Sequence, residues 1–319
     1  MKRDWLDVVA RYGTVVFLIV LVAGFSLSRS DVFPTLLNFL NILNQSAILG
    51  VIAVGLTVCL VMGLFDLSIA AMATLGGYLV CRLLVSQGEN PHILLSIVGV
   101  LAAACAIGIF NGVLVSYLGI SAFIATLAMG SVITGVILGY SESRTIVTGI
   151  PDAFGLIAQD SSFGVPHAVF IMLAVAFVLW VLLEHTQTGR NLYAIGGNPE
   201  ASRLSGLAVK RYGLLALGIS GACAALAGIM ASSSLGAGRP QGVGDTYLLN
   251  AFAAVFIGAS TLRPGQYHIL GPIIGVLLIG VINNGLSILG AQTFWQYIVQ
   301  GALLIVAMFG AGVIFMRRK

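Results

Sequence analysis

Eight polar side chains stand inside or beside long apolar runs of the sequence, where an unpaired amide or acid is costly to bury. They are Asn41, Asn44, Gln45, Asp66, Ser68, Asn111, Asn283 and Asn284. Amides and hydroxyls donate and accept hydrogen bonds without a fixed charge, so a row of them can pass a neutral, polyhydroxylated solute without trapping it. The same groups can instead hydrogen-bond neighbouring helices and hold a bundle together. The residue types therefore indicate either a polar translocation path or internal amide bonds.

The amides near the second apolar run share a helical spacing. Asn38, Asn41 and Asn44 recur every three residues, and Gln45 follows directly. This spacing places the side chains close to one face of a helix. The path interpretation requires that face to point into the path.

Asp66 is the only acid between two long apolar runs, so its charge needs water or a partner. Its carboxylate can act as an N-cap and accept the first free backbone N–H groups of the following helix, with Ser68 as a second acceptor. We favour this structural role over contact with a solute. A proton relay is weakened because no second embedded acid, histidine or lysine stands nearby in the sequence.

The chain has no motif for nucleotide binding or for covalent catalysis. A P-loop needs Gly-x-x-x-x-Gly-Lys-Ser/Thr, whereas the lysines are Lys2, Lys210 and Lys319, and none of them follows a glycine. No serine lies in a Gly-x-Ser-x-Gly elbow. We therefore expect no catalytic residue, no metal site and no cofactor on this chain. ATP-driven work would need a separate ATPase subunit.

Composition sets the class of the elements that position these residues. Hydrophobic residues make up 59% of the chain and charged residues 8%, against about 25% charged residues in soluble domains. Apolar runs of about 20 residues without strict alternation predict helices rather than a closed barrel. The chain is therefore predicted to be an all-α, polytopic helical membrane protein, with residues 1–319 as one transmembrane domain. About ten spans are expected, at 13–28, 45–64, 67–86, 92–117, 120–139, 164–183, 212–234, 246–261, 267–288 and 294–316.

The basic residues predict the orientation of the bundle. An even number of spans puts both termini on one side, and assigning them to the cytoplasm places eleven of the 15 Lys and Arg residues there. The net charge of +4 does not indicate nucleic-acid binding, because these residues lie at span ends and not in a stripe with aromatics. A cleaved secretory signal ending near Ser26 and Ser28 is an alternative for the first span, and it would leave nine spans.

Two boundaries between spans are short, near Phe65 and Asp66 and between Tyr117 and Ile120. Either place could be a broken helix. Glycines four residues apart, such as Gly108 with Gly112, are expected to let helices pack closely inside the chain rather than to form a dimerisation motif.

A polar, basic segment at about 185–211 interrupts the apolar sequence. Its charged residues include Arg190, Glu200, Arg203, Lys210 and Arg211. Charge of this density belongs in water, so we expect a cytosolic surface that docks a partner, with a plain amphiphilic linker as the alternative. Pro199 suits a first helical turn capped by Asn198, Glu200 complements the positive end of that helix, and Arg203 can pair with an acidic partner surface.

The chain resembles the membrane permeases of ribose-type sugar ABC importers, a bacterial family that depends on a binding protein. The resemblance covers nearly the whole length and is carried by the segments 41–45, 52–57, 63–68, 122–127, 193–206 and 284–290. Among these, the box Gly-Gly-Asn-x-Glu-Ala-x-Arg-Leu-Ser-Gly at 196–206 is highly specific.

The resemblance implies a complex in the bacterial inner membrane. It would contain a second permease subunit, identical or homologous, two cytosolic ABC ATPase subunits that bind ATP and Mg²⁺, and a periplasmic sugar-binding protein, all around one path in membrane lipid. It also implies that the box forms the helix that contacts the ATPase, with the residues Gly196, Gly197, Asn198, Pro199, Glu200, Arg203, Leu204, Ser205 and Gly206.

The segment 260–267 departs from the family, which usually has a Gly-rich turn there. Arg263 and Pro264 make this turn stiffer and charged, which is compatible with a subunit that pairs with a different permease. The predicted function is the permease subunit of an ATP-driven importer of a monosaccharide-like solute. The alternatives are an ion-coupled secondary carrier for a small polar solute and a membrane anchor that moves no solute.

Overall fold

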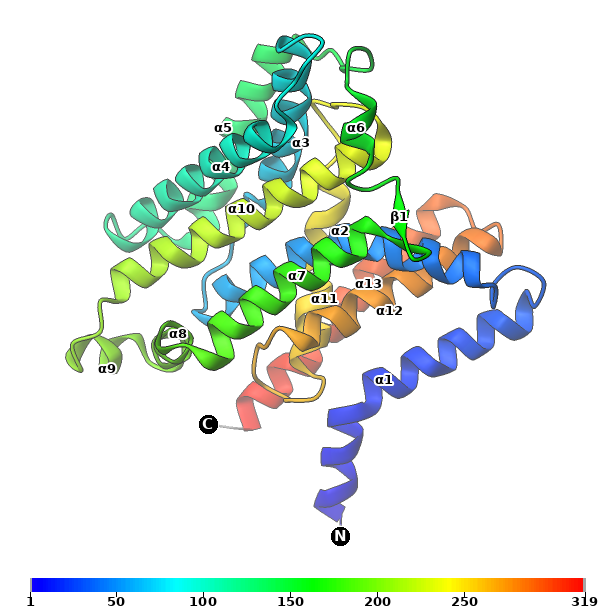
Figure 1. Cartoon of the computed structure of the whole chain (residues 1–319). Helices are drawn as coiled ribbons and strands as arrows, with labels where there is room; N and C mark the ends of the chain where they lie inside the picture. Colours follow the sequence, from blue (N-terminus) through cyan, green and yellow to red (C-terminus); the bar gives the residue numbers. More distant parts are fainter. Residues whose placement is uncertain (1, 318–319) are drawn as a thin grey trace.

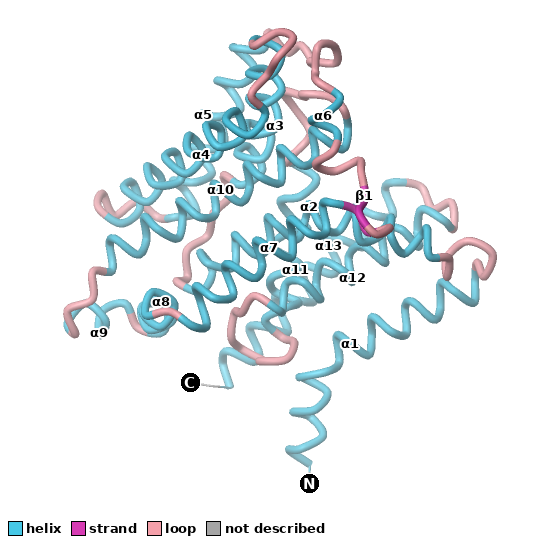
Figure 2. Tube along the Cα trace, in the orientation of Figure 1, coloured by secondary structure: helices cyan, strands magenta, loops and turns pink. Residues whose placement is uncertain are grey.

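The computed structural model describes residues 2–317, with side chains described for residues 12–306 and 308. Most of it is helical, as Figures 1 and 2 show. The helices are α1 (Lys2–Ser28), α2 (Leu36–Val61), α3 (Ile69–Ser86), α4 (Ile93–Ser116), α5 (Ala122–Ser141), α6 (Asp152–Gly155), α7 (His167–Trp180) with the π-helical turn η1 (Val181–His185), α8 (Gln187–Gly197), α9 (Pro199–Leu204), α10 (Val209–Leu235), α11 (Asp245–Ala259), α12 (Leu270–Ile288) and α13 (Thr293–Arg317). Two-residue strands β1 (Ser161–Ser162) and β2 (Val165–Pro166) pair antiparallel.

Seven of the described helices are long and apolar enough to cross a membrane: α2, α3, α4, α5, α7 with η1, α10 and α12. Three shorter apolar helices, Tyr12–Ser28, Asp245–Ala259 and Thr293–Val306, coincide with the remaining expected spans. The predicted class is confirmed as a multi-pass helical membrane protein, and the count of ten stays a prediction. The terminal basic residues Lys2, Arg3, Arg318 and Lys319, on which the predicted orientation partly rests, lie outside the residues with described side chains.

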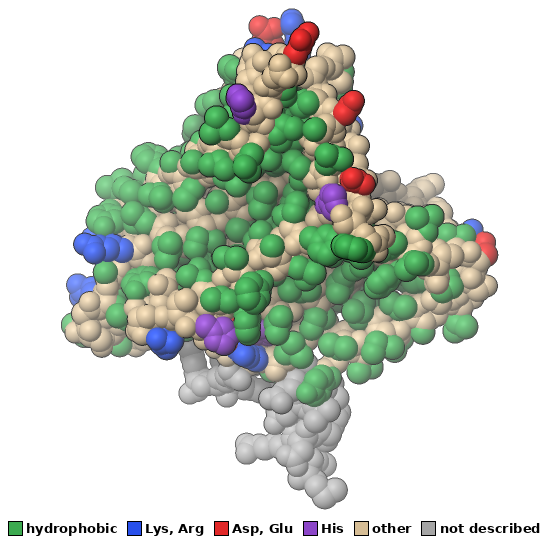
Figure 3. All heavy atoms as spheres, in the orientation of Figure 1, with side chains coloured by type: hydrophobic (Ala, Val, Ile, Leu, Met, Phe, Trp, Pro, Cys, Tyr) green, Lys and Arg blue, Asp and Glu red, His purple; other side chains and the backbone are tan. Residues whose placement is uncertain are grey.

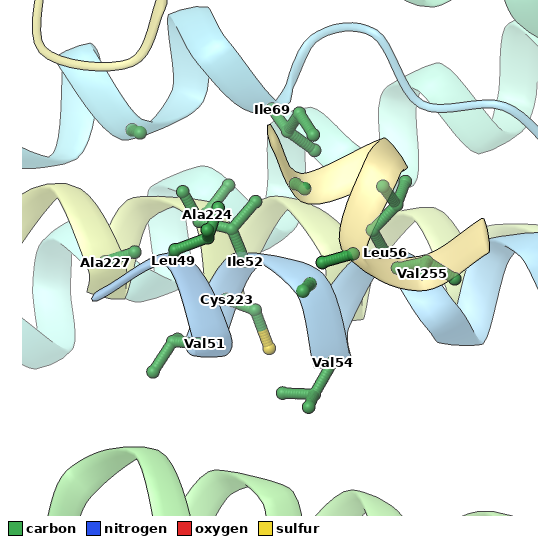
Figure 4. Packing of buried hydrophobic residues seen from close by; sticks show 14 of the residues in the cluster. Leu49, Val51, Ile52, Val54, Leu56, Ile69, Cys223, Ala224, Ala227 and Val255 are labelled. Atoms are coloured by element: carbon green, nitrogen blue, oxygen red, sulfur yellow. The ribbon is translucent and has the colours of Figure 1, made fainter. Parts of the chain in front are cut away.

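The core is built around α2, whose residues from Ser46 to Val61 are all buried. Figure 4 shows Leu49, Ile52 and Leu56 of α2 packed among Ala224 of α10 and Val255 of α11. α10 crosses this core and contacts α2, α3 and α4. A helix with apolar residues on every side is expected at the centre of such a bundle.

Glycines allow α10 to approach α3 and α4 closely. A Cβ on Gly108 would overlap the carbonyl oxygen of Leu217, and a Cβ on Gly228 would overlap that of Ala73. The predicted close packing inside the chain is therefore confirmed for Gly108. Gly135 and Gly139, a further pair four residues apart on α5, have no atoms within 4 Å of a built Cβ in the described residues, so this pair does not pack internally.

The second span begins earlier than the sequence predicted. α2 starts at Leu36 and not near residue 45, because the hydroxyl of Thr35 caps it by accepting the N–H of Asn38 at 3.3 Å. The helical amides were interpreted as leading into the span, and they lie inside the helix instead. The two doubtful boundaries are non-helical, between Val61 and Ile69 and between Ser116 and Ala122.

α1 lies at the edge of the bundle (Figure 1). It contacts α12, where the ring of Phe25 fills the space beside Gly285. The short elements α6, β1 and β2 lie in the connection between α5 and α7. α6 lies close to the end of α10, and β2 contacts α2 and α7.

Candidate functional site

A polar pocket lies between five helices. Its volume is about 460 Å³, within the range of about 300–1,000 Å³ typical of small-molecule sites. Thirteen of the 19 described residues that line it are polar and none is charged. The lining residues are Asn44, Gln45, Ser46, Ile48 and Leu49 of α2, Ala231, Ser234 and Leu235 of α10, Thr246, Tyr247 and Asn250 of α11, Ile279, Gly280, Asn283 and Ser287 of α12, and Thr293, Gln296, Tyr297 and Gln300 of α13.

Side chains of α12 and α13 hydrogen-bond each other across the pocket wall. Gln300 Nε2 donates to Asn283 Oδ1 at 3.2 Å, and Gln296 Nε2 donates to the hydroxyl oxygen of Ser287 at 3.0 Å. Gln296 and Gln300 are one helical turn apart on α13, so they present a ladder of amides. The wall is therefore built from neutral hydrogen-bonding groups that already hold defined positions.

Three buried oxygen atoms on the pocket lining have no hydrogen-bond partner in the described residues. They are Asn44 Oδ1, Ser46 Oγ and Asn250 Oδ1. The amide nitrogen of Asn250 is held by the carbonyl of Thr246 at 2.9 Å, which fixes the side chain and leaves its oxygen available. A buried acceptor without a partner costs roughly 1–3 kcal/mol. These three oxygens are covered by neighbouring atoms, so the hydroxyl groups of a guest or water reach them only when the lining moves.

The remaining predicted path residues divide between two other places. Asn41 is exposed and does not line the pocket. Asn284 pairs with Asn38, whose Nδ2 donates to Asn284 Oδ1 at 3.0 Å while Asn284 Nδ2 returns a bond to Asn38 Oδ1 at 2.8 Å. Asn38 also donates to the carbonyl of Phe33 at 3.0 Å. For this pair, the amides join α2 to α12.

Asp66, Ser68 and Asn111 form a second buried cluster away from the pocket lining. All three are fully buried. Asp66 Oδ1 accepts the backbone N–H of Ser68 at 3.0 Å and its hydroxyl at 2.5 Å, and Asn111 Nδ2 donates to the Ser68 hydroxyl oxygen at 3.1 Å. The hydroxyl of Ser220 on α10 lies near the carboxyl of Asp66.

The predicted N-cap at Asp66 differs from the structure. The N-cap of α3 is Ser68, and its side chain makes no capping bond. Asp66 instead closes a turn two residues long, and the Ser68 hydroxyl donates to Asp66 rather than accepting from the helix. The bond from Asn111 to Ser68 joins the break between α2 and α3 to α4. In the described residues, Asp66 Oδ2, Asn111 Oδ1 and Ser220 Oγ have no hydrogen-bond partner.

The polar segment folds as the two short helices α8 and α9, which lie side by side at one end of the molecule (Figure 1). On the face drawn in Figure 3, Lys and Arg gather around this end and acidic side chains gather at the opposite end. α9 begins as predicted: Pro199 stands in its first turn, and Asn198 Oδ1 caps it by accepting the N–H of Ala201 at 2.9 Å. A water-exposed basic end is what the sequence predicted for this segment.

Glu200 and Arg203 pair with each other on the open face of α9. Arg203 Nη2 lies 2.6 Å from Glu200 Oε1, and both side chains are about two-thirds exposed. The hydrogen bond from Arg203 holds the pKa of Glu200 below its usual range. Leu204, 78% exposed, stands beside this pair in sequence and leaves an apolar contact point on a charged surface.

α8 is seated firmly on the bundle. A Cβ on Gly196 would overlap the carbonyl oxygen of Val61 at the end of α2. By contrast, Gly197 has open space around it, and Gly206 has a φ of +85° that closes the segment after α9. Within residues 196–206, Gly196 therefore packs against the end of α2, whereas most residues of α9 form an exposed surface.

Comparison with known proteins places the chain in a family. The family model described as "Branched-chain amino acid transport system / permease component" matches residues 38–308. The ribose import permease protein RbsC of Escherichia coli (strain K12) is 35% identical over 298 residues, covering 92% of this chain and 91% of the relative. The chain belongs to this family of importer permeases. No solved structure matches the permease.

Two further relatives extend the comparison. RbsC of Bacillus subtilis (strain 168) is 37% identical to the permease over 310 residues, covering 96% of the permease and 94% of the relative. The galactose/methyl galactoside import permease protein MglC of Escherichia coli (strain K12) is 32% identical over 335 residues, covering 100% of the permease and 98% of the relative. The resemblance to sugar importer permeases is thus confirmed.

Sequence reasoning found only part of the permease's pocket. It named Asn44, Gln45 and Asn283, and it missed the α11 and α13 walls. The amide spacing of Gln296 and Gln300 on α13 was a signal that could have found one of them, and the Thr246–Asn250 spacing was a signal for the other. Neither stood out because both lie near span ends, where polar residues are ordinary.

Proposed function

We propose that the permease is the membrane-spanning subunit of an ATP-driven importer of a monosaccharide-like solute, and that the polar pocket belongs to its translocation path. The observation that supports this most is the set of unpartnered oxygens Asn44 Oδ1, Ser46 Oγ and Asn250 Oδ1 on an uncharged lining. A sugar carries several hydroxyl donors and no charge, so it meets these acceptors and leaves without breaking an ion pair.

The proposal includes a set of partners. The exposed surface of α9, with Glu200, Arg203 and Leu204, docks a cytosolic ATPase that binds ATP and Mg²⁺. A second permease subunit, identical or homologous, completes the path, and a periplasmic binding protein delivers the sugar. Family membership and the basic end at α8 and α9 support this arrangement.

The topology follows from the same assignment. Residues 1–319 form one transmembrane domain of ten spans in the bacterial inner membrane, with both termini and the segment 185–211 in the cytoplasm. Three shorter apolar helices, Tyr12–Ser28, Asp245–Ala259 and Thr293–Val306, supply the first, eighth and tenth spans where the bilayer thins and neighbouring helices shield their polar groups.

Uptake by proteoliposomes tests the proposal. The permease is reconstituted with its ATPase and binding protein, and uptake of labelled ribose, allose and galactose is measured. Asn250→Leu and Asn44→Leu remove pocket acceptors, and Asn41→Leu, an exposed amide one turn from Asn44, is the matched control. We expect the first two variants to lose at least about tenfold in uptake and the control to transport normally. Equal uptake by all three would refute the role of the pocket.

An ion-coupled carrier is the second candidate, and the buried carboxylate of Asp66 is the one observation in its favour. Asp66 does not line the pocket, and its hydrogen-bond partners are the neutral groups of Ser68. Uptake that collapses with a protonophore while ATP is held constant would favour this candidate. We expect uptake to follow ATP instead.

A further inference from the structure

The hairpin of α11 and α12 is held together by direct backbone contact. A Cβ built on Gly271 would lie 2.5 Å from the carbonyl oxygen of Gly258, and one on Gly275 would overlap the carbonyl of Ala254. At these positions the seam contains only glycine and alanine, so the two backbones meet directly. Two helices in such close contact move together, because sliding one along the other forces carbonyls against Cα atoms.

The turn of this hairpin, residues 260–269, is tied across its own ends. His268 Nδ1 accepts the N–H of Gly271 at 3.1 Å, so the proton sits on Nε2, which lies 3.0 Å from the carbonyl oxygen of Thr261. The Thr261 hydroxyl donates in turn to Ile257 at 2.9 Å. These bonds join the end of α11 to the start of α12 and make the turn an ordered part of the hairpin.

Two contacts attach this turn to the end of α7 and to α8. Arg263 Nη1 lies 2.8 Å from Oε1 and 2.7 Å from Oε2 of Glu184, a residue of η1 that is only 17% exposed. The hydroxyl of Tyr193 on α8 donates to the carbonyl oxygen of Tyr267 at 2.8 Å. We call these two contacts the clasp. Charge-assisted bonds of this length are the strong ones among protein hydrogen bonds.

The clasp is backed by close packing on the side of α8. A Cβ on Gly189 would overlap the carbonyl oxygen of Leu183, so the start of α8 abuts η1 directly. η1 is a π-helical turn, an irregularity common at functional positions in helices. Glu184 and Tyr193 therefore belong to one packed unit, and the hairpin turn is fastened to that unit at two points.

The far end of the same hairpin lines the pocket. Thr246 and Asn250 lie in the first turns of α11, and Asn283 and Ser287 lie near the end of α12. The clasp and the pocket thus sit at opposite ends of one stiff pair of helices. A displacement applied at the turn changes the positions of the pocket amides.

We propose that the α11–α12 hairpin acts as a lever, a rigid element that transmits movement of α8 to the pocket. The clasp, formed by Glu184, Arg263, Tyr193 and Tyr267, attaches the hairpin to η1 and α8. This inference rests on the proposed function, in which an ATPase moves α8 and α9. It assigns a positioning role to Arg263, the charged residue in the turn that departs from the family's usual Gly-rich sequence. In this proposal α9 docks the ATPase, and α8 transmits the resulting movement to the hairpin.

The test measures sugar taken up per ATP hydrolysed in proteoliposomes, together with retention of the ATPase on the immobilised permease. Arg263→Gln and Tyr193→Phe remove one contact each, and Glu184→Arg combined with Arg263→Glu restores the pair with its charges exchanged. Glu142 and Arg144, an exposed ion pair on the α5–α6 connection, provide the control variant Arg144→Gln.

We expect the single variants to lower uptake per ATP about tenfold, within the usual range of coupling between sites, with ATPase retention unchanged. The exchanged pair should recover most of the loss, and the control should match wild type. Wild-type uptake per ATP in both single variants overturns the lever, as does loss of ATPase retention, which would make the clasp a docking element. If Arg263→Gln aggregates, the uptake per ATP of Tyr193→Phe, a variant that removes a single oxygen atom, decides whether the clasp transmits movement. A wild-type complex without ATP-dependent uptake refutes the proposed function instead.

Discussion

Asn38 and Asn284 face each other from α2 and α12 and exchange two amide hydrogen bonds, of 3.0 and 2.8 Å. The two residues are 246 positions apart in the sequence. Their amides were predicted to line a path or to hold the bundle, and for this pair the second alternative describes the geometry. α12 carries pocket residues on the same helix, so the pair also fixes one wall of the pocket.

Removing one member of this amide pair should destabilise the fold more than removing both. Asn38→Leu leaves the Asn284 amide without its partner, at a cost of roughly 1–3 kcal/mol. The double variant with Asn284→Leu replaces the bonds by apolar contact and should recover part of that loss. Thermal unfolding in detergent, followed by size-exclusion fluorescence, measures both. A double variant no more stable than Asn38→Leu alone would contradict this prediction.

Asp66→Asn should keep both folding and uptake near wild type. The amide oxygen can accept from Ser68 as Oδ1 does now, and the new N–H₂ group can meet the unpartnered Ser220 oxygen. Asp66→Ala should lower stability by about 1–3 kcal/mol, because Ser68 then loses its acceptor. Loss of uptake in a well-folded Asp66→Asn protein would indicate a proton-carrying role instead.

Acid should loosen the hairpin turn. Burial lowers the pKa of His268 below its ordinary value of 6.5, and its Nδ1 can accept from Gly271 only while unprotonated. The unfolded chain takes up the proton first as pH falls, so this stabilisation is complete above about pH 6.5 and is lost as pH drops through the folded value. Hydrogen exchange of residues 260–271 at pH 7.5 and 5.5 should show the change, and His268→Gln should not show it.

Glu200→Ala and Arg203→Ala should lower uptake without lowering stability. Both side chains are exposed, and exposed ion pairs add little to folding. Their proposed role is contact with the ATPase, so the variants should reach the membrane at normal levels and lose ATP-dependent uptake. Unchanged transport in vesicles by both variants would rule out docking at this face.

The sequence was sufficient for the class, most helix positions and the start of α9. Apolar run length predicts spans because hydrocarbon demands internally bonded backbone, and the order Asn198, Pro199, Glu200 is a local capping signal that needs no tertiary context. The same local logic failed at α2, where nine residues before the expected start are helical. Among these residues, Asn38 has a tertiary partner in Asn284 that apolar run length does not reveal.

The site was harder to predict because it depends on which helices meet. Asn283 and Asn284 are neighbours in sequence, yet one lines the pocket and the other bonds to Asn38, since adjacent helical residues point about 100° apart. The contacts of Arg263 with Glu184 and of Tyr193 with Tyr267 span more than 70 residues each. Only the folded arrangement brings them together.

The pocket and the Asp66 cluster draw on different side chains. In the proposed function, recognition of a solute and maintenance of the α2–α3 break therefore depend on separate sets of residues. If the pocket binds the solute as proposed, exchanges between amide and hydroxyl side chains at Thr246, Gln296 or Gln300 would change which sugar is accepted and leave the Asp66 cluster intact. In such a permease, solute specificity can change without changes to the contacts that hold the helix bundle together.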